Sequence, residues 1–510
     1  MTDRGVSLVT ASGVDDEVGT FCLVLHTHLP WVAHAGAWPV GEEWLHQAFT
    51  SSWRRVIAVC EKLAGKGRRE LLTLGITPTV AAMLDDPYCL DEIFRWTGNW
   101  ALRAEELTAR RDPDLRELGR FEYAEAIACQ TDVEARWLRG GSPILRRLAD
   151  DSVVELLGGP IAHPFLPLLD DRLVAHSLRS GLDDAEIRWG QQPKGIWAPE
   201  CGYRPGLEDI YAAHGVRRVL VDGPSLHGRT AQAHPIGTSD VLAFGRDLGV
   251  TYRVWSPKSG YPGNPAYRDF HTFDHASGFR PARVTSRRTP PEDKAPWDPD
   301  LARLTARRDA RDFVDIVRRR LLDLRAAAGR PAMTIAAFDT ELFGHWWYEG
   351  PVWLEEVLRQ LPLAGVRVTT LRGALDAGHI GAPVEIQKSS WGSGKDWRVW
   401  PGPQVADIVE AGDVLAKQLM STVDSRRRLG RDHGLDQLCR EAYLALASDW
   451  AFMVSKDSAV DYARSRIATH STRFDRLRRA MDTDPVRAGD LAIDWRRVDG
   501  PWGHLDARLL

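Results

Sequence analysis

The stretch over residues 336–350 constrains this chain most. A mostly apolar run, residues 333–338, ends there in the carboxylate of Asp339, and a second carboxylate, Glu341, follows two residues later. A glycine, a histidine and three aromatic residues come next. Such a run is typical of a strand buried in a parallel sheet, and active sites form at the carboxyl ends of these strands. The alternative is a core strand followed by an aromatic-rich helix, although a carboxylate placed after a buried strand is unusual unless it is paired.

The composition excludes several classes of function. The 510 residues are enough for a large core and more than one domain. A net charge of −4 gives no sign of nucleic acid or of an anionic membrane as partner. The 20 tryptophans offer flat apolar faces, and without a basic groove they favour sugars over bases. The first 18 residues lack an apolar signal core and no window approaches 18 consecutive apolar residues, so we expect no membrane partner.

The cysteines indicate the cellular compartment. Six are scattered along the chain, and no two have the C-x-x-C spacing of a thiolate zinc site or a redox motif. Reduced thiols of this kind are typical of the cytosol. We therefore expect a cytoplasmic protein.

Histidines follow the first predicted strand. Residues 21–25 are apolar, and His26-Thr27-His28 comes directly after them. Residues two apart on a strand face the same side, so both imidazoles can enter one pocket. Three interpretations stay open at this point: a metal-binding pair, a pair that hydrogen-bonds a sugar, and a structural pair. A metal site needs at least one further ligand.

Three more predicted strands are followed by polar residues. His163 comes after the strand at residues 153–157, Glu200 after the strand at residues 195–198, and Asp222 ends the strand at residues 218–221. Repeated strand–helix units with polar strand ends predict a β/α barrel, in which such ends meet at one face. The candidates for a single pocket, taken from this pattern, are His26, His28, His163, Glu200 and Asp339.

The pattern changes along the chain in a way that predicts three units. Residues 86–150 read as amphipathic helices without a strand, and residues 403–480 contain only helical patterns. We therefore predict a discontinuous catalytic barrel over 1–85 and 151–385, a helical insertion over 86–150 and a helical C-terminal domain over 386–510. Within the barrel, residues 253–255 are expected to be β structure, residues 256–308 irregular, and residues 311–327 a helix.

Two carboxylates without an evident set of metal ligands suggest glycoside chemistry. In a retaining mechanism one carboxylate attacks the anomeric carbon while the other serves first as acid and then as base, which needs a separation of about 5–5.5 Å. The acid must keep its proton near neutral pH, and both desolvation and a neighbouring carboxylate favour this.

These residues resemble the motifs of glycoside hydrolase family 57, and within it those of the 1,4-α-glucan branching enzymes. Five stretches match in order, and the resemblance covers nearly the whole chain, including the helical C-terminus. The fourth, Phe338-Asp339-Thr340-Glu341-Leu342-Phe343-Gly344-His345-Trp346-Trp347, is very close to the family pattern. The other four are residues 26–30, the stretch around His163, residues 195–201 and residues 389–392.

The resemblance implies a fold, a reaction and a set of site residues. The fold is α/β: an incomplete (β/α)7 barrel with a helical insertion and an all-helical C-terminal domain that contributes aromatic residues to the cleft. The reaction is retaining transfer without a metal or other cofactor, and the partner is an α-1,4-glucan such as amylose or a glycogen-like polymer. The resemblance makes Glu200 the nucleophile and Asp339 the general acid/base. The substrate-binding residues that it implies are His26, His28, His163, Trp255, Trp391 and Trp400.

One departure from the family pattern concerns a loop. Branching enzymes of the family commonly carry a longer loop before the Trp255 segment, with a tyrosine that reaches over the cleft. Here the corresponding loop, residues 223–250, is short, and there is no tyrosine between Ala212 and Thr251. Water and a sugar hydroxyl compete for the glycosyl-enzyme, and desolvation helps to decide between them. The short loop therefore leaves the ratio of transfer to hydrolysis open.

Four hypotheses follow, in order of preference. The first is a branching enzyme, and the second is an α-amylase-like hydrolase or 4-α-glucanotransferase of the same family. A non-catalytic glucan-binding protein is third, and the presence of both Glu200 and Asp339 argues against it. A metal-dependent deacetylase using His26, His28 and an aspartate is fourth. We expect a monomer or a homodimer.

Overall fold

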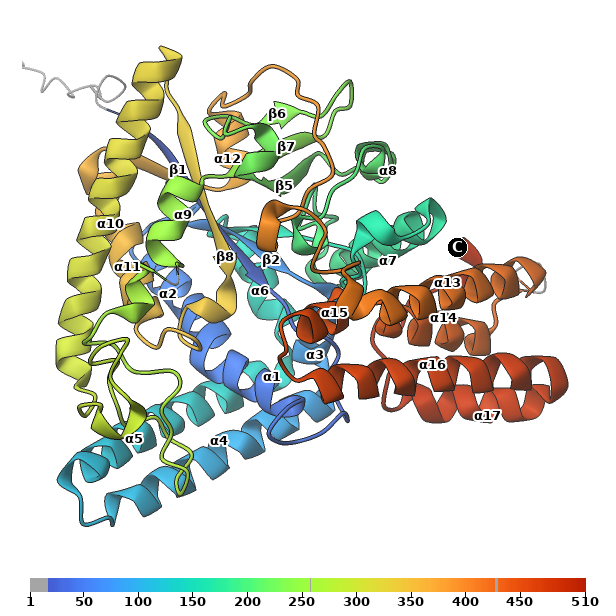
Figure 1. The fold of residues 1–510 in the computed structure, drawn as a ribbon, viewed down its shortest axis with the longest axis horizontal. Helices are drawn as coiled ribbons and strands as arrows, with labels where there is room; N and C mark the ends of the chain where they lie inside the picture. Colours follow the sequence, from blue (N-terminus) through green and yellow to red (C-terminus); the bar gives the residue numbers. More distant parts are fainter. Residues whose placement is uncertain (1–16, 257, 427–429) are drawn as a thin grey trace, which may run out of the picture.

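The computed structural model describes residues 17–256, 258–426 and 430–510, so most of the polar N-terminal stretch lies outside the described residues. Figure 1 shows a sheet-containing body with a group of long helices beside it. The body holds the strands, and the adjacent group is formed by the C-terminal part of the chain. None of the described helices is long and apolar enough to cross a membrane.

Seven parallel strands of the described chain form the barrel. One sheet has the order β3-β2-β1-β8, and the other has the order β4-β5-β7 with the short β6 (His234–Pro235) antiparallel at its edge. β9 (Val366–Thr369) pairs with the first half of β1. The seven strands are β1 (Gly19–Thr27), β2 (Leu72–Ile76), β3 (Val154–Leu157), β4 (Gly195–Ile196), β5 (Arg218–Asp222), β7 (Leu242–Arg246) and β8 (Met333–Asp339).

Single backbone contacts join the two sheets into a ring. Between β3 and β4, Gly158 N–H donates to Gly195 C=O at 3.1 Å and Trp197 N–H donates to Gly158 C=O at 3.0 Å. Between β7 and β8, Asp247 N–H donates to Ile335 C=O at 2.8 Å. The ring is thus closed by isolated bonds rather than by full ladders. This agrees with the predicted α/β fold built on an incomplete (β/α)7 barrel.

Helices cover the outside of the barrel and connect its strands (Figure 1). A five-residue π-helical turn, Phe49–Trp53, lies between α1 and α2. The helices of this part of the chain are α1 (Glu42–Ala48), α2 (Arg54–Ala64), α3 (Pro78–Asp85), α6 (Ser142–Asp150), α7 (Asp171–Trp189), α8 (Leu207–Ala213), α9 (Leu248–Val254), α10 (Pro299–Ala328), α11 (Gly350–Gln360) and α12 (Leu371–Asp376).

Two long antiparallel helices, α4 (Pro87–Thr108) and α5 (Pro113–Arg136), occupy the middle of the predicted insertion. Each starts at an Asp-Pro pair: the Asp86 and Asp112 side chains accept hydrogen bonds from backbone N–H groups of the first turn, and the proline follows at the first helical position. The structure describes only helical elements between residues 87 and 150. The three-unit division of the chain remains our proposal.

Two predictions of local structure are wrong. Residues 253–255 are not β structure: Val254 ends the helix α9, whose first turn is capped by the Asp247 side chain accepting from Gly249 N–H at 2.8 Å. The helix α10 begins at Pro299, within the segment predicted to be irregular. Asp298 caps it, and the proline stands at the first helical position, where the missing N–H costs nothing.

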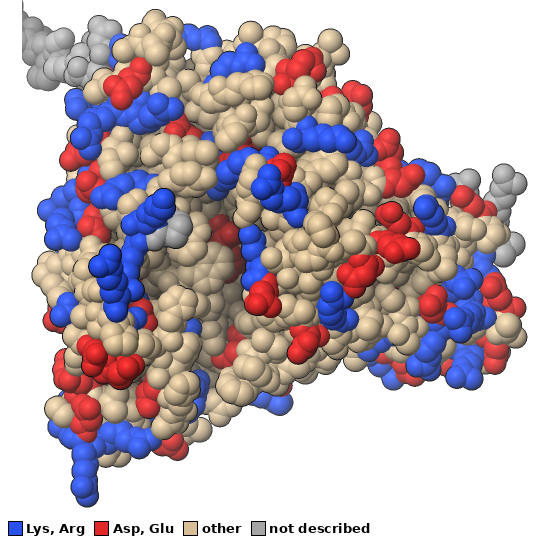
Figure 2. Space-filling model, viewed as in Figure 1, with Lys and Arg blue, Asp and Glu red and all other residues tan. Residues whose placement is uncertain are grey.

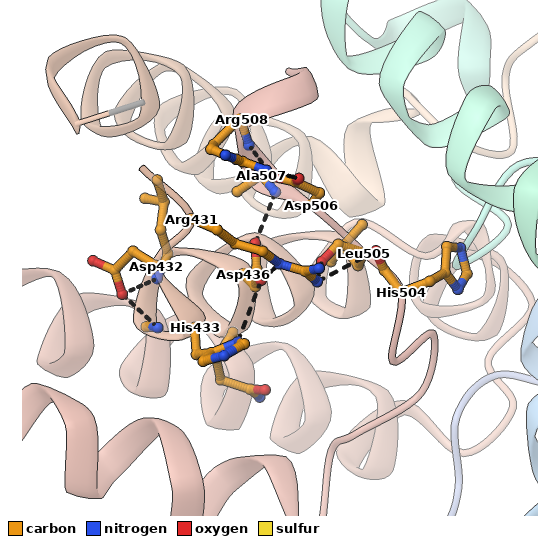
Figure 3. A network of polar contacts seen from close by, with 12 residues as sticks. Arg431, Asp432, His433, Asp436, His504, Leu505, Asp506, Ala507 and Arg508 are labelled. Atoms are coloured by element: carbon orange, nitrogen blue, oxygen red, sulfur yellow. Dashed lines mark hydrogen bonds and ion pairs between the residues drawn. The ribbon is translucent and has the colours of Figure 1, made fainter. Parts of the chain in front are cut away.

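The C-terminal helices pack beside the barrel and are tied to it by the end of the chain. Figure 3 shows Asp436 of α14 at the centre of a polar network that holds the last residues. Its carboxylate accepts from Ala507 N–H at 2.9 Å and pairs with Arg431 at 3.0 Å. The C-terminal helices are α13 (Ala406–Arg426), α14 (His433–Ala445), α15 (Ser448–Ser455), α16 (Val460–Thr483) and α17 (Pro485–Arg496).

Candidate active site

The alternation of side chains along the strands decides what reaches the barrel mouth. Cys22 and Val24 of β1, Ile335 and Ala337 of β8 and their counterparts on β5 and β7 fill the barrel interior. Continuing each strand by two residues gives the last inward position at its carboxyl end. These positions hold His26, Asp222, Arg246 and Asp339. β1 and β8 are also in register, so that His26 lies directly beside Asp339.

A cavity open to solvent lies at this mouth. Figure 2 shows this face of the molecule hollowed near its centre, with acidic side chains inside and basic side chains around the opening. The structure brings every candidate residue to this one cavity. The predicted residues that line it are His26, His28, His163, Glu200, Trp255, Asp339, Trp391 and Trp400.

Glu200 stands on a strained turn after β4. Its φ is 61° and that of the following Cys201 is 49°, both in the left-handed region. A non-glycine residue held there costs about 1–3 kcal/mol and persists where the surroundings enforce it. Trp391 supplies two of the contacts: its backbone N–H donates to the Glu200 carbonyl at 2.9 Å, and its indole N–H donates to Oε2 at 2.9 Å. Ser448 Oγ donates to Oε1 at 3.1 Å.

Asp339 is the second carboxylate and ends β8. Burial raises its pKa to about 7, and the neighbouring Glu200 carboxylate adds to the rise, while His28 and Arg246 oppose it. Within the described part of the chain, the Asp339 carboxylate has no hydrogen-bond donor. Its environment therefore keeps a large fraction of Asp339 protonated near pH 7.

Burial also raises the pKa of Glu200 to about 7, and the nearby Asp449 adds to the rise. The hydrogen bonds from Trp391 and Ser448 oppose this shift, because they stabilise the charged carboxylate. The two acids interact, so the loss of the first proton is a property of the pair and not of either residue. Trp391 and Ser448 stabilise a negative charge on Glu200, so the remaining proton stays on Asp339.

The histidines form a hydrogen-bonded chain that ends at Glu200. Because Ser448 O–H donates to Glu200, its oxygen accepts from His163 Nδ1–H, at 3.0 Å. His163 Nε2 then lacks a proton and accepts from His26 Nε2–H at 3.1 Å. Burial lowers the pKa of both His26 and His163 well below the ordinary value, with His28 adding to the effect, so both rings are neutral.

His28 is held from two sides and faces the same cavity. Its Nδ1 lies 3.1 Å from Thr77 Oγ1, and its Nε2 lies 3.0 Å from an Asp449 carboxylate oxygen. The His28 ring also stacks on His163, with centroids 3.7 Å apart. Asp449 and Ser448, both at the start of α15, were missed by the sequence analysis. Ser-Asp at a helix start reads as an ordinary cap, and no local pattern links α15 to the barrel.

The three predicted tryptophans differ in their surroundings. Trp391 hydrogen-bonds Glu200, as described above. Trp255 is 49% exposed and lies parallel to Trp346 with centroids 5.8 Å apart. Trp400 is only 1% exposed and stacks on Phe165 at 4.4 Å, within a small apolar cluster. Although it borders the cavity, most of the Trp400 ring packs inside the protein.

Glu341, the second carboxylate of the opening stretch, is also buried. The indole N–H of Trp53, at the end of the π-helical turn, donates to its Oε1 at 2.5 Å. Burial raises the Glu341 pKa to about 8, with Asp339 adding to the rise. Glu341 thus borders the catalytic cavity and is held there by Trp53.

One group at the cavity has the composition of a metal site. Ligand atoms of His28, His163 and Asp449 all lie within 4.8 Å of one another. The hydrogen bonds described above already join His28 to Thr77 and Asp449, and His163 to Ser448 and His26. These three side chains therefore act as hydrogen-bonding groups in the mechanism proposed below. The expectation of a metal-free site remains a prediction.

A β/α barrel with two interacting carboxylates and aromatic rings at its mouth is the architecture of an enzyme that cleaves glycosidic bonds. The sequence model of glycosyl hydrolase family 57 matches residues 22–261, and that of the 1,4-alpha-glucan branching enzyme C-terminal domain matches residues 414–509. The chain belongs to glycoside hydrolase family 57, which confirms the resemblance seen in the five motifs.

Similar proteins cover almost the whole chain. A probable 1,4-alpha-glucan branching enzyme of Mycobacterium tuberculosis is 53% identical over 517 residues, covering 96% of this chain and 98% of the relative. A 1,4-alpha-glucan branching enzyme of Thermococcus kodakarensis is 32% identical, covering 90% of this chain and 73% of that protein. The crystal structure of a branching enzyme of this family from Pyrococcus horikoshii superposes with a TM-score of 0.90, at 29% identity, and covers 96% of both chains.

Proposed function

We propose that the protein is a 1,4-α-glucan branching enzyme that works by retaining double displacement. The observation that carries the proposal is the contact between Ser448 and Glu200. Ser448 belongs to the region that matches the branching-enzyme C-terminal domain, and Glu200 belongs to the region that matches the family's catalytic part. The two regions thus build one site, and the relatives that share both regions are named as branching enzymes.

In the first step, Asp339 donates its proton to the oxygen of an α-1,4 bond. A carboxylate oxygen of Glu200 attacks the anomeric carbon, the carbon–oxygen bond breaks, and the shortened glucan leaves with a free 4-hydroxyl. The donor chain is then held on Glu200 as a covalent ester. The hydrogen bonds to Glu200, and the lack of any to Asp339 among the described residues, favour the charged Glu200 and the neutral Asp339 that this step needs.

In the second step, the Asp339 carboxylate removes the proton from a 6-hydroxyl of an acceptor glucan. That oxygen attacks the anomeric carbon, the ester bond breaks, and Glu200 is released as a carboxylate. The products are an α-1,6 branch and a protonated Asp339, ready for the next cycle. One α-1,4 bond has been exchanged for one α-1,6 bond, and no water is consumed.

The surrounding residues are assigned to binding. His26, His28 and His163 line the cavity and are assigned to the subsite of the sugar whose bond is cleaved. Trp391 and the exposed Trp255 offer ring faces to the glucan on either side. Trp400 supports this wall from behind, since it is almost fully buried.

A second candidate function is hydrolysis or 4-α-glucan transfer, and the short loop over residues 223–250 favours it. The structure adds one fact: Tyr252, just after this loop, lines the cavity from α9 and is 43% exposed. A tyrosine is therefore present at the cleft, although not on an extended loop. We propose that it takes part in keeping water from the glycosyl-enzyme.

The test is proton NMR of amylose incubated with the purified protein, together with an assay for reducing ends. We expect a growing α-1,6 anomeric signal with few new reducing ends. New reducing ends without that signal would identify a hydrolase and overturn the proposal. A chelator should leave the activity unchanged. Loss of activity with the chelator would instead indicate a metal at His28, His163 and Asp449.

We propose a cytoplasmic location and a glycogen-like or amylose substrate. All six cysteines are buried free thiols among the described residues, as suits a reducing compartment. The expectation of a monomer or homodimer remains a prediction. Gel filtration with light scattering tests it.

A further inference from the structure

A second cavity, open to solvent, lies between the helical insertion and the loop that follows Asp339. It is lined by residues of α1, α4 and α5, of the segment 268–280, and by Gly344, His345 and Tyr348. We propose that this cavity is a second binding site for an α-glucan chain, separate from the catalytic cleft. The proposal rests on the proposed function for the identity of its ligand.

Two tryptophans on one face of α4 form an aromatic wall. Trp96 and Trp100 are four residues apart, and their ring centroids lie 5.6 Å from each other. The Trp96 indole N–H donates to Glu43 at 2.9 Å, and the Trp100 indole N–H donates to Glu122 at 2.9 Å. Both ring planes are therefore fixed by neighbouring helices. Fixed aromatic faces suit a flat apolar sugar face, because little side-chain freedom is lost on binding.

The rim of the cavity carries an exposed phenylalanine on an ordered turn. Phe273 is 40% exposed, and the Arg280 guanidinium lies 4.6 Å from its ring centroid. Asp269 accepts from both the backbone and the hydroxyl of Thr272, which closes this turn from within. An exposed aromatic ring on a rigid turn at a cavity mouth is typical of a contact residue for a ligand.

The charges of the cavity favour a neutral ligand rich in hydroxyl groups. The lining contains both arginines and glutamates, and each arginine pairs with a glutamate or donates to a backbone carbonyl. Glu122 pairs with Arg268, and Arg55 donates to the Tyr348 carbonyl at 3.1 Å. A free phosphate or a cation would meet groups of both signs here. A sugar hydroxyl can donate to the carboxylates and accept from the guanidinium groups.

The cavity lies against the loop of the catalytic site. Residues 339–348 carry Asp339 and Trp346, which border the catalytic cavity, and His345 and Tyr348, which border the second one. A branched polymer presents many chains at once. Holding one chain in the second cavity raises the effective concentration of the others at the cleft.

The first experiment follows the tryptophans directly. The Glu200→Gln variant, which cannot form the covalent intermediate, is labelled with 5-fluorotryptophan and titrated with maltoheptaose, and the Trp96 signal is assigned with Trp96→Phe. We expect a saturable shift of the Trp96 signal as well as that of Trp391. If only Trp391 responds, or if glucose 1-phosphate shifts Trp96 and maltoheptaose does not, the proposal is wrong.

The second experiment compares long and short substrates in the otherwise unaltered enzyme. Trp96→Ala is expected to raise KM for long amylose roughly two- to tenfold, the loss of one aromatic contact, with kcat unchanged. The kcat/KM for a short maltooligosaccharide should stay the same. Phe273→Ala tests the same cavity without touching packed α4. The matched control is Trp38→Ala, since Trp38 is 77% exposed and lines neither cavity.

The outcomes separate this inference from the proposed function. An enzyme that branches amylose but shows no Trp96 shift loses only the second site. An enzyme that binds maltoheptaose at Trp96 but makes no α-1,6 bond loses the proposed reaction and keeps the site. An equal loss on long and short substrates in Phe273→Ala would place this residue in the catalytic cleft and contradict the inference.

Discussion

At the scale of single residues, the two carboxylates differ in their hydrogen bonds more than in their burial. Glu200 has donors on both oxygens, whereas within the described chain Asp339 has none. Burial and mutual repulsion favour one proton on the pair, and the donors decide where the charge settles. The assignment of nucleophile and acid thus rests on two neighbouring side chains, Trp391 and Ser448.

The roles of the two acids can be separated with an activated substrate. Asp339→Asn is expected to lower kcat on amylose about 10²- to 10⁴-fold, because the leaving oxygen loses its proton donor. With an α-glucosyl fluoride, whose leaving group needs no proton, the first step should recover in Asp339→Asn and stay lost in Glu200→Gln. Single-turnover kinetics measures this step. Recovery in Glu200→Gln instead would reverse the assignment.

Ser448→Ala should move the acid limb of the kcat/KM profile to higher pH. Ser448 donates to the charged form of Glu200, so its removal raises the Glu200 pKa, by up to about one unit. Activity then appears only at a higher pH as the nucleophile ionises. Ser455→Ala, at the other end of α15, serves as the control and should keep the original profile. A lower activity without any shift of the limb would assign Ser448 a purely structural role.

Glu341 should make stability depend on pH. Its pKa is raised from an ordinary value of 4.5 to about 8 in the folded state, so the folded protein binds the proton more tightly than the unfolded chain. This contribution is full below about pH 4.5 and is lost as pH rises through about 8. Glu341→Gln should therefore lose less stability than the parent between pH 5 and 8. Urea unfolding at several pH values measures the free energy of unfolding, with Glu355→Gln on the outer α11 surface as control. The same dependence of this free energy on pH in Glu341→Gln and in the parent would refute the account.

At the scale of elements, one buried carboxylate links two strand ends to the loop that carries Trp391. Asp222 of β5 lies opposite Arg246 of β7 and accepts from its Nε at 2.7 Å. It also pairs with Lys395 at 2.8 Å. Arg246 lies 5.2 Å from the Trp391 ring centroid, and Lys395 donates to the Trp391 carbonyl at 3.0 Å. Both cations thus hold Trp391 in place beside Glu200.

Asp222→Asn should consequently weaken catalysis through Trp391. We expect kcat/KM to fall roughly tenfold, the value of one hydrogen bond to a charged group, with the acid limb shifted to higher pH. The double variant with Trp391→Phe should be no worse than Trp391→Phe alone. The matched control is Glu155→Gln, because Glu155 pairs with Arg218 at the other end of β5. Additive losses in the double variant would show that Asp222 acts independently.

At the scale of the whole molecule, the last ten residues join the C-terminal helices to the barrel. His176 of α7 contacts the Asp506 carbonyl at 3.1 Å, and His504 contacts the Ser180 carbonyl at 2.9 Å. On the other side, Ala507 donates to Asp436 of α14 (Figure 3). The catalytic cavity lies between the same two units, since α15 supplies Ser448. The chain end therefore holds together the parts that form the site.

Removing this contact should affect stability and catalysis together. Trp502 is almost fully buried, and Trp502→Ala should lower the free energy of unfolding by about 3–5 kcal/mol. Deletion of residues 501–510 should in addition lower kcat/KM in the protein that still folds, because Ser448 and Trp391 lose their fixed position. Thermal unfolding and amylose kinetics measure the two effects. Full activity in a destabilised deletion variant would contradict the role in positioning.

The sequence by itself determined the barrel class, most of its strands and the residues at the strand ends. His26 and Asp339 were predictable because alternation along a strand is local, and the chain of apolar residues marks where it ends. The start of α10 lies inside the segment predicted to be irregular because proline and charged residues are also typical of loops, although the Asp298 cap makes Pro299 a helix start. The helix α9 was missed because its β-branched residues resemble a strand until the Asp247 cap is considered.

Only the tertiary structure decided which distant residues complete the site. Ser448 lies 248 positions from Glu200 and Asp449 lies 421 positions from His28, and no local pattern connects them. The same holds for the left-handed backbone at Glu200 and for the burial of Trp400, since both depend on what packs around them. Side-chain periodicity is fixed by the neighbouring residues of the chain, whereas hydrogen-bond partners and pKa values are fixed by elements that meet only when the molecule folds.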